Sequence, residues 1–247
     1  MKIGIIVLCT NAYFPLGIRL IKRFNQFYKG ESEITYYLFS DKNPKPYLPD
    51  NIDCKWSFME NKNWVDGTNM KFKSILSLSE CKSDHLYYVD ADTNISKHFS
   101  DWFIGEIVGG EHYGNRGYIE KPFDRNPNSQ AYVPKDTNLP QMYYYGAFFA
   151  GEKEKMLDLC AVLKGMQKQD KMINYEPVWN DESYLNKIFH YVPPQVIKCE
   201  DFMFEVSDKG GIGETRDMNL DISELLEALL VNKEKNINIV RGKVIAE

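Results

Sequence analysis

Short apolar runs and stretches of helical periodicity alternate along the first third of the chain. Residues 2–10 form a continuous run rich in β-branched side chains, which is typical of a strand buried on both faces of a parallel sheet. Apolar residues then recur at near-helical spacing from Leu16 to Tyr28, and Gly30 follows as a stop signal. The same patterns predict strands at 34–39, 52–58 and 85–89 and a helix at 70–78.

Strands that alternate with helices in this way predict an α/β fold with a mainly parallel central sheet flanked by helices. Such sheets bind ligands beyond the carboxyl ends of their strands. We find no internal repeat and no linker at which to divide the chain, so a single domain is expected over residues 1–247. The rest of the pattern predicts a strand at 143–149, helices at 153–166 and 182–190, with Asp181 as N-cap of the latter, and an acidic helix at 222–231.

Composition narrows the possible functions. The chain has 30 basic and 35 acidic side chains, a net charge of −5 and a pI near 5.5, which argue against a dedicated nucleic-acid-binding protein. No apolar run approaches the length of a membrane span and no signal peptide follows Met1, so no membrane anchor is expected. Five cysteines without metal-type spacing indicate reduced thiols and a cytoplasmic location. We expect a monomer or a weak oligomer.

Two carboxylates, Asp90 and Asp92, follow the strand at 85–89 directly. Two acids separated by one residue at a strand end can hold one hard divalent cation, which takes its other ligands from substrate phosphates. Such a metal ion would neutralise a nucleoside diphosphate as it departs as a leaving group. The alternative is that these residues only belong to a turn, where Asp and Asn are common.

A second acidic group stands in the string Trp179-Asn-Asp-Glu-Ser-Tyr-Leu-Asn-Lys187. Asp181 and Glu182 lie at the expected start of a helix, where the helix dipole alone favours negative charge. The functional interpretation places Glu182 opposite a sugar anomeric carbon, with Asp181 binding sugar hydroxyls and Trp179 as an apolar platform. Similarly, Gly146 and Ala147 either let another backbone pack closely against an aromatic strand or form a floor beneath a ring-shaped ligand.

Taken together, Asp90-Ala-Asp92, the stretch from Tyr143 to Gly151 and the string from Trp179 to Lys187 resemble glycosyltransferase family 6. These retaining transferases include the ABO blood-group enzymes and α-1,3-galactosyltransferase. Weaker support comes from His112, from Ser129 to Pro134 and from the opening strand, so that the resemblance covers residues 2–205. It implies a GT-A type, Rossmann-like fold and a soluble member of bacterial or viral type. It also implies a nucleotide-binding half at 1–95, an acceptor and donor-sugar half at 96–205, and a C-terminal helix and tail at 206–247.

The resemblance implies roles for individual residues. Asp90 and Asp92 match the family's metal motif, which holds Mn²⁺ (or Mg²⁺) beside a UDP-sugar donor, and Glu182 matches the proposed nucleophile or cation stabiliser. Tyr145 and Ala147 match positions that select between galactose and N-acetylgalactosamine. The residues matching donor contacts are Leu8, Cys9, Tyr13, Lys71, Asp90, Tyr145, Ala147 and Asp181, and those matching acceptor contacts are His112, Trp179 and Asn180.

Two residues and the C-terminal segment depart from the family pattern. Asn180 stands where the better-known members have His, which affects the acceptor contacts. Lys71 stands where the family usually has Arg, so a positive charge is kept but the bidentate fork is lost. The C-terminal segment has no clear match to the basic tail that closes over UDP, although Arg241 or Lys243 are candidates for that role.

The implied activity is that of a metal-dependent hexosyltransferase. It would move galactose or N-acetylgalactosamine from UDP to a glycan hydroxyl and form an α-linkage, α-1,3 by the family pattern. The alternative is a non-catalytic nucleotide- or glycan-binding relative of the same fold, against which the joint presence of Asp90, Asp92, Asp181 and Glu182 counts. A sugar nucleotidyltransferase is disfavoured because residues 11–15, after the first strand, contain no glycine.

Overall fold

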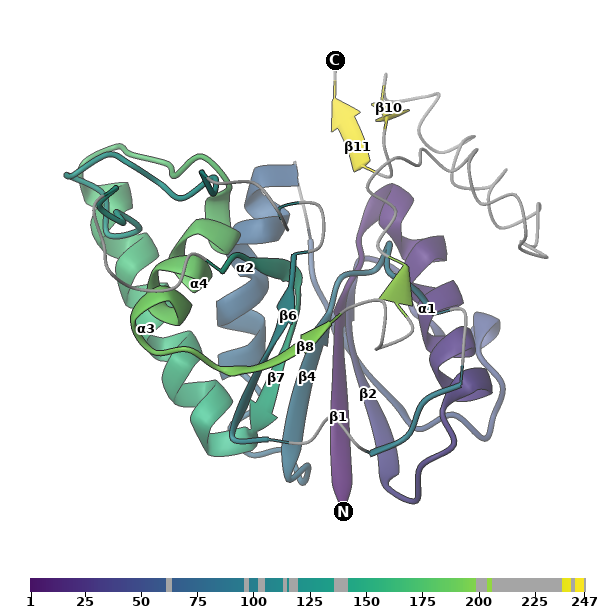
Figure 1. The fold of residues 1–247 in the computed structure, drawn as a ribbon. Helices are drawn as coiled ribbons and strands as arrows, with labels where there is room; N and C mark the ends of the chain where they lie inside the picture. Colours follow the sequence, from purple (N-terminus) through teal and green to yellow (C-terminus); the bar gives the residue numbers. More distant parts are fainter. Residues whose placement is uncertain are drawn as a thin grey trace.

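The protein forms one central sheet with helices on both faces (Figure 1). A computed structural model describes residues 1–60, 64–95, 98–101, 105–112, 115, 120–135, 142–198, 204–205, 237–240 and 243–246. The strands of the sheet are β1 (Lys2–Leu8), β2 (Glu33–Ser40), β3 (Cys54–Phe58), β4 (His85–Val89), β6 (Ile107–Glu111), β7 (Tyr144–Glu152) and β8 (Gln195–Lys198). The helices are α1 (Phe14–Phe27), α2 (Trp64–Leu76), α3 (Lys153–Met172) and α4 (Asn180–Tyr191), with short 3-10 turns η1 (Asn11–Tyr13) and η2 (Lys45–Tyr47).

The strand order in the seven-stranded sheet is β3-β2-β1-β4-β7-β6-β8. The pairs β1–β2, β1–β4, β2–β3 and β6–β8 are parallel, whereas β7 runs antiparallel to both β4 and β6. Consequently the start of β7 lies at the same edge of the sheet as the carboxyl ends of the other strands. Two smaller antiparallel pairs join β5 (Asn94–Ile95) to β9 (Phe204–Glu205) and β10 (Ile237–Val240) to β11 (Lys243–Ala246).

Alternating side chains of β1 enter two separate cores. Ile3, Ile5 and Val7 pack with the apolar face of α1, and Ile6 points to the opposite core, which holds residues of α2, α3 and α4. Figure 1 shows α1 on one face of the sheet and the other three helices on the other face. Because both faces are covered, the central strands are apolar throughout, as a buried parallel sheet requires.

The predicted α/β fold with a mainly parallel sheet is confirmed. Strands β6 and β8 were not predicted, and α3 continues six residues beyond the expected end at Met166. The predicted helix at 222–231 lies outside the described residues. Among the described residues, no helix combines the length and apolar character needed to cross a membrane.

Candidate active site

The end of β4 places Asp90 beside β7 and α2. The Asp90 backbone N–H donates to the carbonyl of Ala147 at 2.9 Å, and the Tyr88 hydroxyl donates to Asp90 Oδ1 at 2.6 Å. The same Oδ1 lies 3.7 Å from the ammonium of Lys71, while the Asp90 side chain keeps 36% of its surface exposed. Asp92 follows two residues later at the same edge and is half-buried. One oxygen of Asp90 is therefore held from inside the protein, and the carboxylate still reaches the surface.

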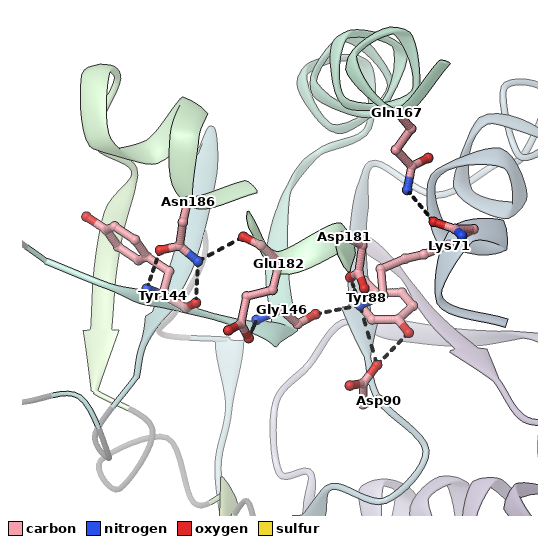
Figure 2. A network of polar contacts seen from close by, with 10 residues as sticks. Lys71, Tyr88, Asp90, Tyr144, Gly146, Gln167, Asp181, Glu182 and Asn186 are labelled. Atoms are coloured by element: carbon pink, nitrogen blue, oxygen red, sulfur yellow. Dashed lines mark hydrogen bonds and ion pairs between the residues drawn. The ribbon is translucent and has the colours of Figure 1, made fainter. Parts of the chain in front are cut away.

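Lys71, on α2, joins three elements through its buried ammonium (Figure 2). Its Nζ donates to the Gly146 carbonyl at 2.9 Å, forms an ion pair with Asp181, and lies 4.4 Å from the centre of the Tyr88 ring. Burial alone would lower the pKa of Lys71, but the carboxylates of Asp181 and Asp90 outweigh it and raise the pKa. The lysine is therefore a fixed positive charge at the centre of an acidic group.

Glu182 lies against the backbone of β7 at Gly146. The Gly146 N–H donates to Glu182 Oε2 at 2.7 Å. A side chain at position 146 would bring its Cβ to 2.9 Å from Glu182 Cβ, so the close approach requires glycine. Burial raises the pKa of Glu182 to about 7, in opposition to the Gly146 hydrogen bond and with a smaller contribution from the negative charge of Asp181. Glu182 thus changes charge near neutral pH.

Helix α4 is fixed to β7 by an asparagine of the Trp179–Lys187 string. Asn186 accepts from the Tyr144 N–H at 2.7 Å and donates to the Tyr144 carbonyl at 2.8 Å. It also donates to the Glu182 carbonyl at 3.0 Å, one helical turn back. These hydrogen bonds fix the position of α4 along β7, so that Glu182 faces Gly146 (Figure 2).

Asn186→Ala should lower the free energy of unfolding by about 2–3 kcal/mol, because the backbone N–H and the backbone carbonyl of Tyr144 both lose a buried hydrogen-bond partner. Urea denaturation measures the change. The matched control is Gln167→Ala, which removes a 3.4 Å hydrogen bond to Asn69 at the surface. It should change the free energy of unfolding by less than about 0.5 kcal/mol. Equal effects of the two substitutions would contradict the anchoring role of Asn186.

The predicted N-cap role of Asp181 is wrong. The helix begins at Asn180, with Trp179 in the cap position and no hydrogen bond from a capping side chain. The Asp181 carboxylate instead turns inward and pairs with Lys71. The ion pair contributes more to stability than an exposed N-cap would. Without Asp181, the charge of Lys71 would be buried without a partner, which is strongly destabilising.

The remaining predicted donor residues lie near the carboxyl end of β1 or on β7. Leu8 and Tyr13 are half-buried, whereas the Cys9 thiol points into the core and lies against Gly17. The whole of Cys9 is buried, and its backbone N–H donates to the carbonyl of Phe39 at 2.9 Å. On β7, Tyr145 is buried and Ala147 is half-buried.

The predicted acceptor residues fall into two places. His112, just after β6, stacks on the Tyr145 ring with centroids 3.9 Å apart, so it contacts a predicted donor residue. Trp179 is 47% exposed at the start of α4. Asn180 has a φ of 46°, a left-handed conformation that Asn tolerates better than most residues. Arg241 and the side chain of Lys243 lie outside the described residues.

The sequence pattern did not point to two tyrosines that lie at the site, Tyr88 and Tyr143. Tyr88 holds Asp90, and a signal for this contact was available, because residues two apart on a strand share a face. Tyr143 is buried close to Glu182, and burial, with a smaller contribution from the negative charge of Glu182, raises the pKa of Tyr143. No local pattern distinguishes Tyr143 from its neighbours Tyr144 and Tyr145.

The acids at the end of β4 suit a metal ion that brings further ligands with it. Among the described residues, no three His, Cys, Asp or Glu side chains converge on a possible metal position. Asp90 and Asp92 offer two carboxylates at the edge of the sheet, and Mg²⁺ or Mn²⁺ commonly takes one or two carboxylates plus water and substrate phosphates. The donor set therefore fits a cation that accompanies a diphosphate.

A mainly parallel sheet flanked by helices, with carboxylates at the carboxyl ends of its strands, is the arrangement of a GT-A type, Rossmann-like glycosyltransferase domain. The sequence matches glycosyltransferase family 6 over residues 1–241, and the chain belongs to this family.

Curated relatives are distant but cover most of the chain. Histo-blood group ABO system transferase 1 of Rattus norvegicus is 26% identical over 213 residues, which are 82% of this chain and 61% of that protein. Globoside alpha-1,3-N-acetylgalactosaminyltransferase 1 of Gallus gallus is 22% identical over 217 residues, 83% of this chain and 62% of that protein. The O-antigen biosynthesis glycosyltransferase WbnI of Escherichia coli is 26% identical over 203 residues, 80% of this chain and 86% of that protein. The chain thus spans only 61–62% of the two animal relatives.

Proposed function

We propose that the protein is a retaining hexosyltransferase that moves galactose or N-acetylgalactosamine from a UDP-sugar to a glycan hydroxyl and forms an α-linkage. The observation that carries this proposal is the meeting of Asp90, Asp181 and Glu182 around the buried ammonium of Lys71. The names of the relatives, which include an α-1,3-N-acetylgalactosaminyltransferase, support the sugar class and an α-1,3 linkage.

Each acid has a separate task in this proposal. Asp90 and Asp92 hold a divalent cation, Mn²⁺ or Mg²⁺, which neutralises the diphosphate of UDP when it is bound. Asp181, fixed by Lys71, accepts hydrogen bonds from donor-sugar hydroxyls. Glu182, fixed by the Gly146 N–H, presents its free oxygen to the positive charge that develops at the anomeric carbon.

Retention of configuration is open to two routes from this geometry. In one, Glu182 attacks the anomeric carbon, UDP leaves, and the acceptor hydroxyl displaces Glu182 in a second inversion. In the other, the acceptor attacks from the face that UDP leaves, and Glu182 stabilises the positive charge without forming a bond. Glu182 must be ionised on either route.

The donor site is proposed to extend from Leu8, Cys9 and Tyr13 to Tyr145 and Ala147. The methyl group of Ala147 takes room beside the donor sugar, which favours galactose over the bulkier N-acetyl sugar. His112, Trp179 and Asn180 are proposed to contact the acceptor. The exposed face of Trp179 suits the apolar face of a sugar ring.

The test of the function is a titration with UDP in the presence and absence of Mn²⁺, followed by UDP release from UDP-galactose and UDP-N-acetylgalactosamine on a glycan array. Binding followed by sugar transfer supports the transferase. Binding of UDP without release from either donor would instead identify a non-catalytic nucleotide- or glycan-binding protein. The kcat/KM ratio of the two donors measures the donor preference.

EDTA should abolish transfer and added Mn²⁺ should restore it, because two carboxylates and a diphosphate complete one coordination shell. For the same reason, UDP and Mn²⁺ should each tighten the binding of the other. The double substitution Asp90→Asn with Asp92→Asn should keep the fold and remove the metal stimulation. Asp158→Asn on the exposed face of α3 is the control and should leave it intact. Full activity in EDTA after dialysis would contradict metal dependence.

A further inference from the structure

Tyr88 fixes one particular oxygen of Asp90. Its hydroxyl donates to Asp90 Oδ1 at 2.6 Å, and the ammonium of Lys71 lies 3.7 Å from the same oxygen (Figure 2). Both contacts therefore use Oδ1, while the Asp90 side chain keeps 36% of its surface exposed. Oδ2 is the oxygen that remains for a ligand at the edge of the sheet.

The ring of Tyr88 has little freedom to move. It is 3% exposed, packs against Phe149 with ring centroids 5.3 Å apart, and has the Lys71 ammonium 4.4 Å from its centre. The Asp90 backbone is held as well, because its N–H donates to the Ala147 carbonyl at 2.9 Å. The hydroxyl and the carboxylate thus keep one fixed orientation relative to each other.

Divalent cations differ in how they use a carboxylate. Mg²⁺ requires near-octahedral geometry, and an octahedral shell of oxygens is also typical of Mn²⁺. The two oxygens of one carboxylate lie too close together to occupy two corners of an octahedron without distortion. Ca²⁺ takes about six to eight oxygens in a flexible shell and often accepts both oxygens of one carboxylate. A carboxylate that offers a single oxygen therefore favours the smaller ions.

We propose that Tyr88 is a positioning residue that makes Asp90 a one-oxygen ligand and thereby sets a preference for Mn²⁺ or Mg²⁺ over Ca²⁺. The inference rests on the proposed function, in which Asp90 and Asp92 hold a cation beside the diphosphate, and it adds what selects that cation. Tyr88 acts through Asp90 and does not itself touch the metal ion. Loss of a hydrogen-bond partner that orients a metal ligand typically lowers metal affinity by about 10–100-fold.

The test is Tyr88→Phe, which removes the hydroxyl and keeps the ring against Phe149 and Lys71. Electron paramagnetic resonance measures Mn²⁺ binding to the protein saturated with UDP, and competition with Ca²⁺ gives the affinity for the second ion. Ca²⁺ affinity should stay unchanged or rise in the variant, because the freed Oδ1 allows both oxygens of Asp90 to bind. Mn²⁺ should bind at least about tenfold more weakly, so that the preference for Mn²⁺ over Ca²⁺ falls by the same factor or more.

Tyr37→Phe is the matched control. It also takes one tyrosine hydroxyl out of a hydrogen bond, the 3.2 Å contact with Ser83, which lies just before the start of β4 at the opposite edge of the sheet. Both metal affinities should equal those of the unaltered protein. A UDP titration without metal should give one affinity for all three proteins, which also shows that each variant has folded.

A tyrosine that only supports the fold would lower both metal affinities together or neither of them. Equal loss of Mn²⁺ and Ca²⁺ affinity in Tyr88→Phe, or no loss of either, would therefore overturn the inference. A crystal structure of the unaltered protein with UDP and Mn²⁺ gives a test that does not depend on the variant. One Asp90 oxygen on the metal ion supports the inference, and both oxygens on it would overturn it even if sugar is transferred. If the unaltered protein bound no Mn²⁺ in the presence of UDP, the metal-dependent donor site of the proposed function would fail, and the inference with it.

Discussion

Glu182→Gln should lower kcat by at least about 100-fold while the fold and the affinity for UDP remain unchanged. The amide has almost the shape of the carboxylate and its oxygen can still accept from the Gly146 N–H, so the position of the side chain is preserved. What is lost is the negative charge opposite the anomeric carbon. UDP release under saturating donor measures kcat, and a UDP titration measures the affinity.

Glu154→Gln is the matched control for this substitution. Glu154 also lies in the first turn of a helix, α3, but that helix begins where β7 ends, at the opposite edge of the sheet. Its substitution should leave kcat unchanged. An unaltered kcat in Glu182→Gln would exclude Glu182 from the mechanism.

The pH dependence of activity should carry the signature of the same residue. Since the pKa of Glu182 is raised to about 7, kcat/KM should fall as the pH drops through this value and the carboxylate takes up a proton. The Glu182→Gln variant should lose this acid limb in its residual activity. A limb that persists unchanged in the variant would assign the titration to another group.

Stability should respond to pH in the opposite sense. The folded chain holds the Glu182 proton more tightly than the unfolded chain, in which glutamate titrates near 4.5. The unfolded state therefore binds fewer protons between about pH 4.5 and 7, and the contribution of this group to stability falls as the pH rises through that window. Urea denaturation at several pH values across this window gives the free energy of unfolding as a function of pH. This free energy should fall less with rising pH in Glu182→Gln than in the unaltered protein.

The sequence pattern predicted the helices and strands in which apolar residues recur at regular spacing. It did not predict the elements that lack such spacing. β1 and α1 are buried along continuous faces and were predicted to within two residues. β6 contains Gly109 and Gly110, and β8 is a four-residue strand directly after two prolines, so neither shows an alternating pattern. The last turns of α3 are polar, and their helical state follows from tertiary contacts, such as the buried Asp170 that holds Ser129 and Gln130.

The same contrast holds for the site. Some of its residues are placed by the sequence next to them, and others by contacts with residues far away in the chain. The position of Asp90 at the edge of the sheet follows from the sequence, because the apolar run of the buried strand stops at Val89 and the acid comes directly after it. The pairing of Lys71 with Asp181 joins residues 110 positions apart, and no local pattern encodes such a contact. For this reason Asp181 looked like an N-cap residue in the sequence, although its carboxylate belongs to the buried lysine.

Lys71→Met should destabilise the protein by about 3–5 kcal/mol, because it leaves the buried carboxylate of Asp181 without a partner. Methionine fills a similar volume, so the loss comes from charge rather than from a cavity. Urea denaturation measures it. Lys55→Met is the control: it breaks a 2.8 Å ion pair with Asp53, but both side chains are about half exposed or more, and the unfolding midpoint should not move.

The double variant Lys71→Met with Asp181→Asn should recover a large part of the lost stability, since it removes both members of the buried pair. It should not recover activity. In the proposed mechanism, Lys71 holds both Asp181 and Asp90, so its loss displaces the groups that face the donor sugar and the metal ion. Turnover in the double variant should therefore remain at least about 100-fold below that of the unaltered protein, whereas its melting temperature rises above that of Lys71→Met. If stability and turnover recovered together, Lys71 would be a structural counter-ion and nothing more.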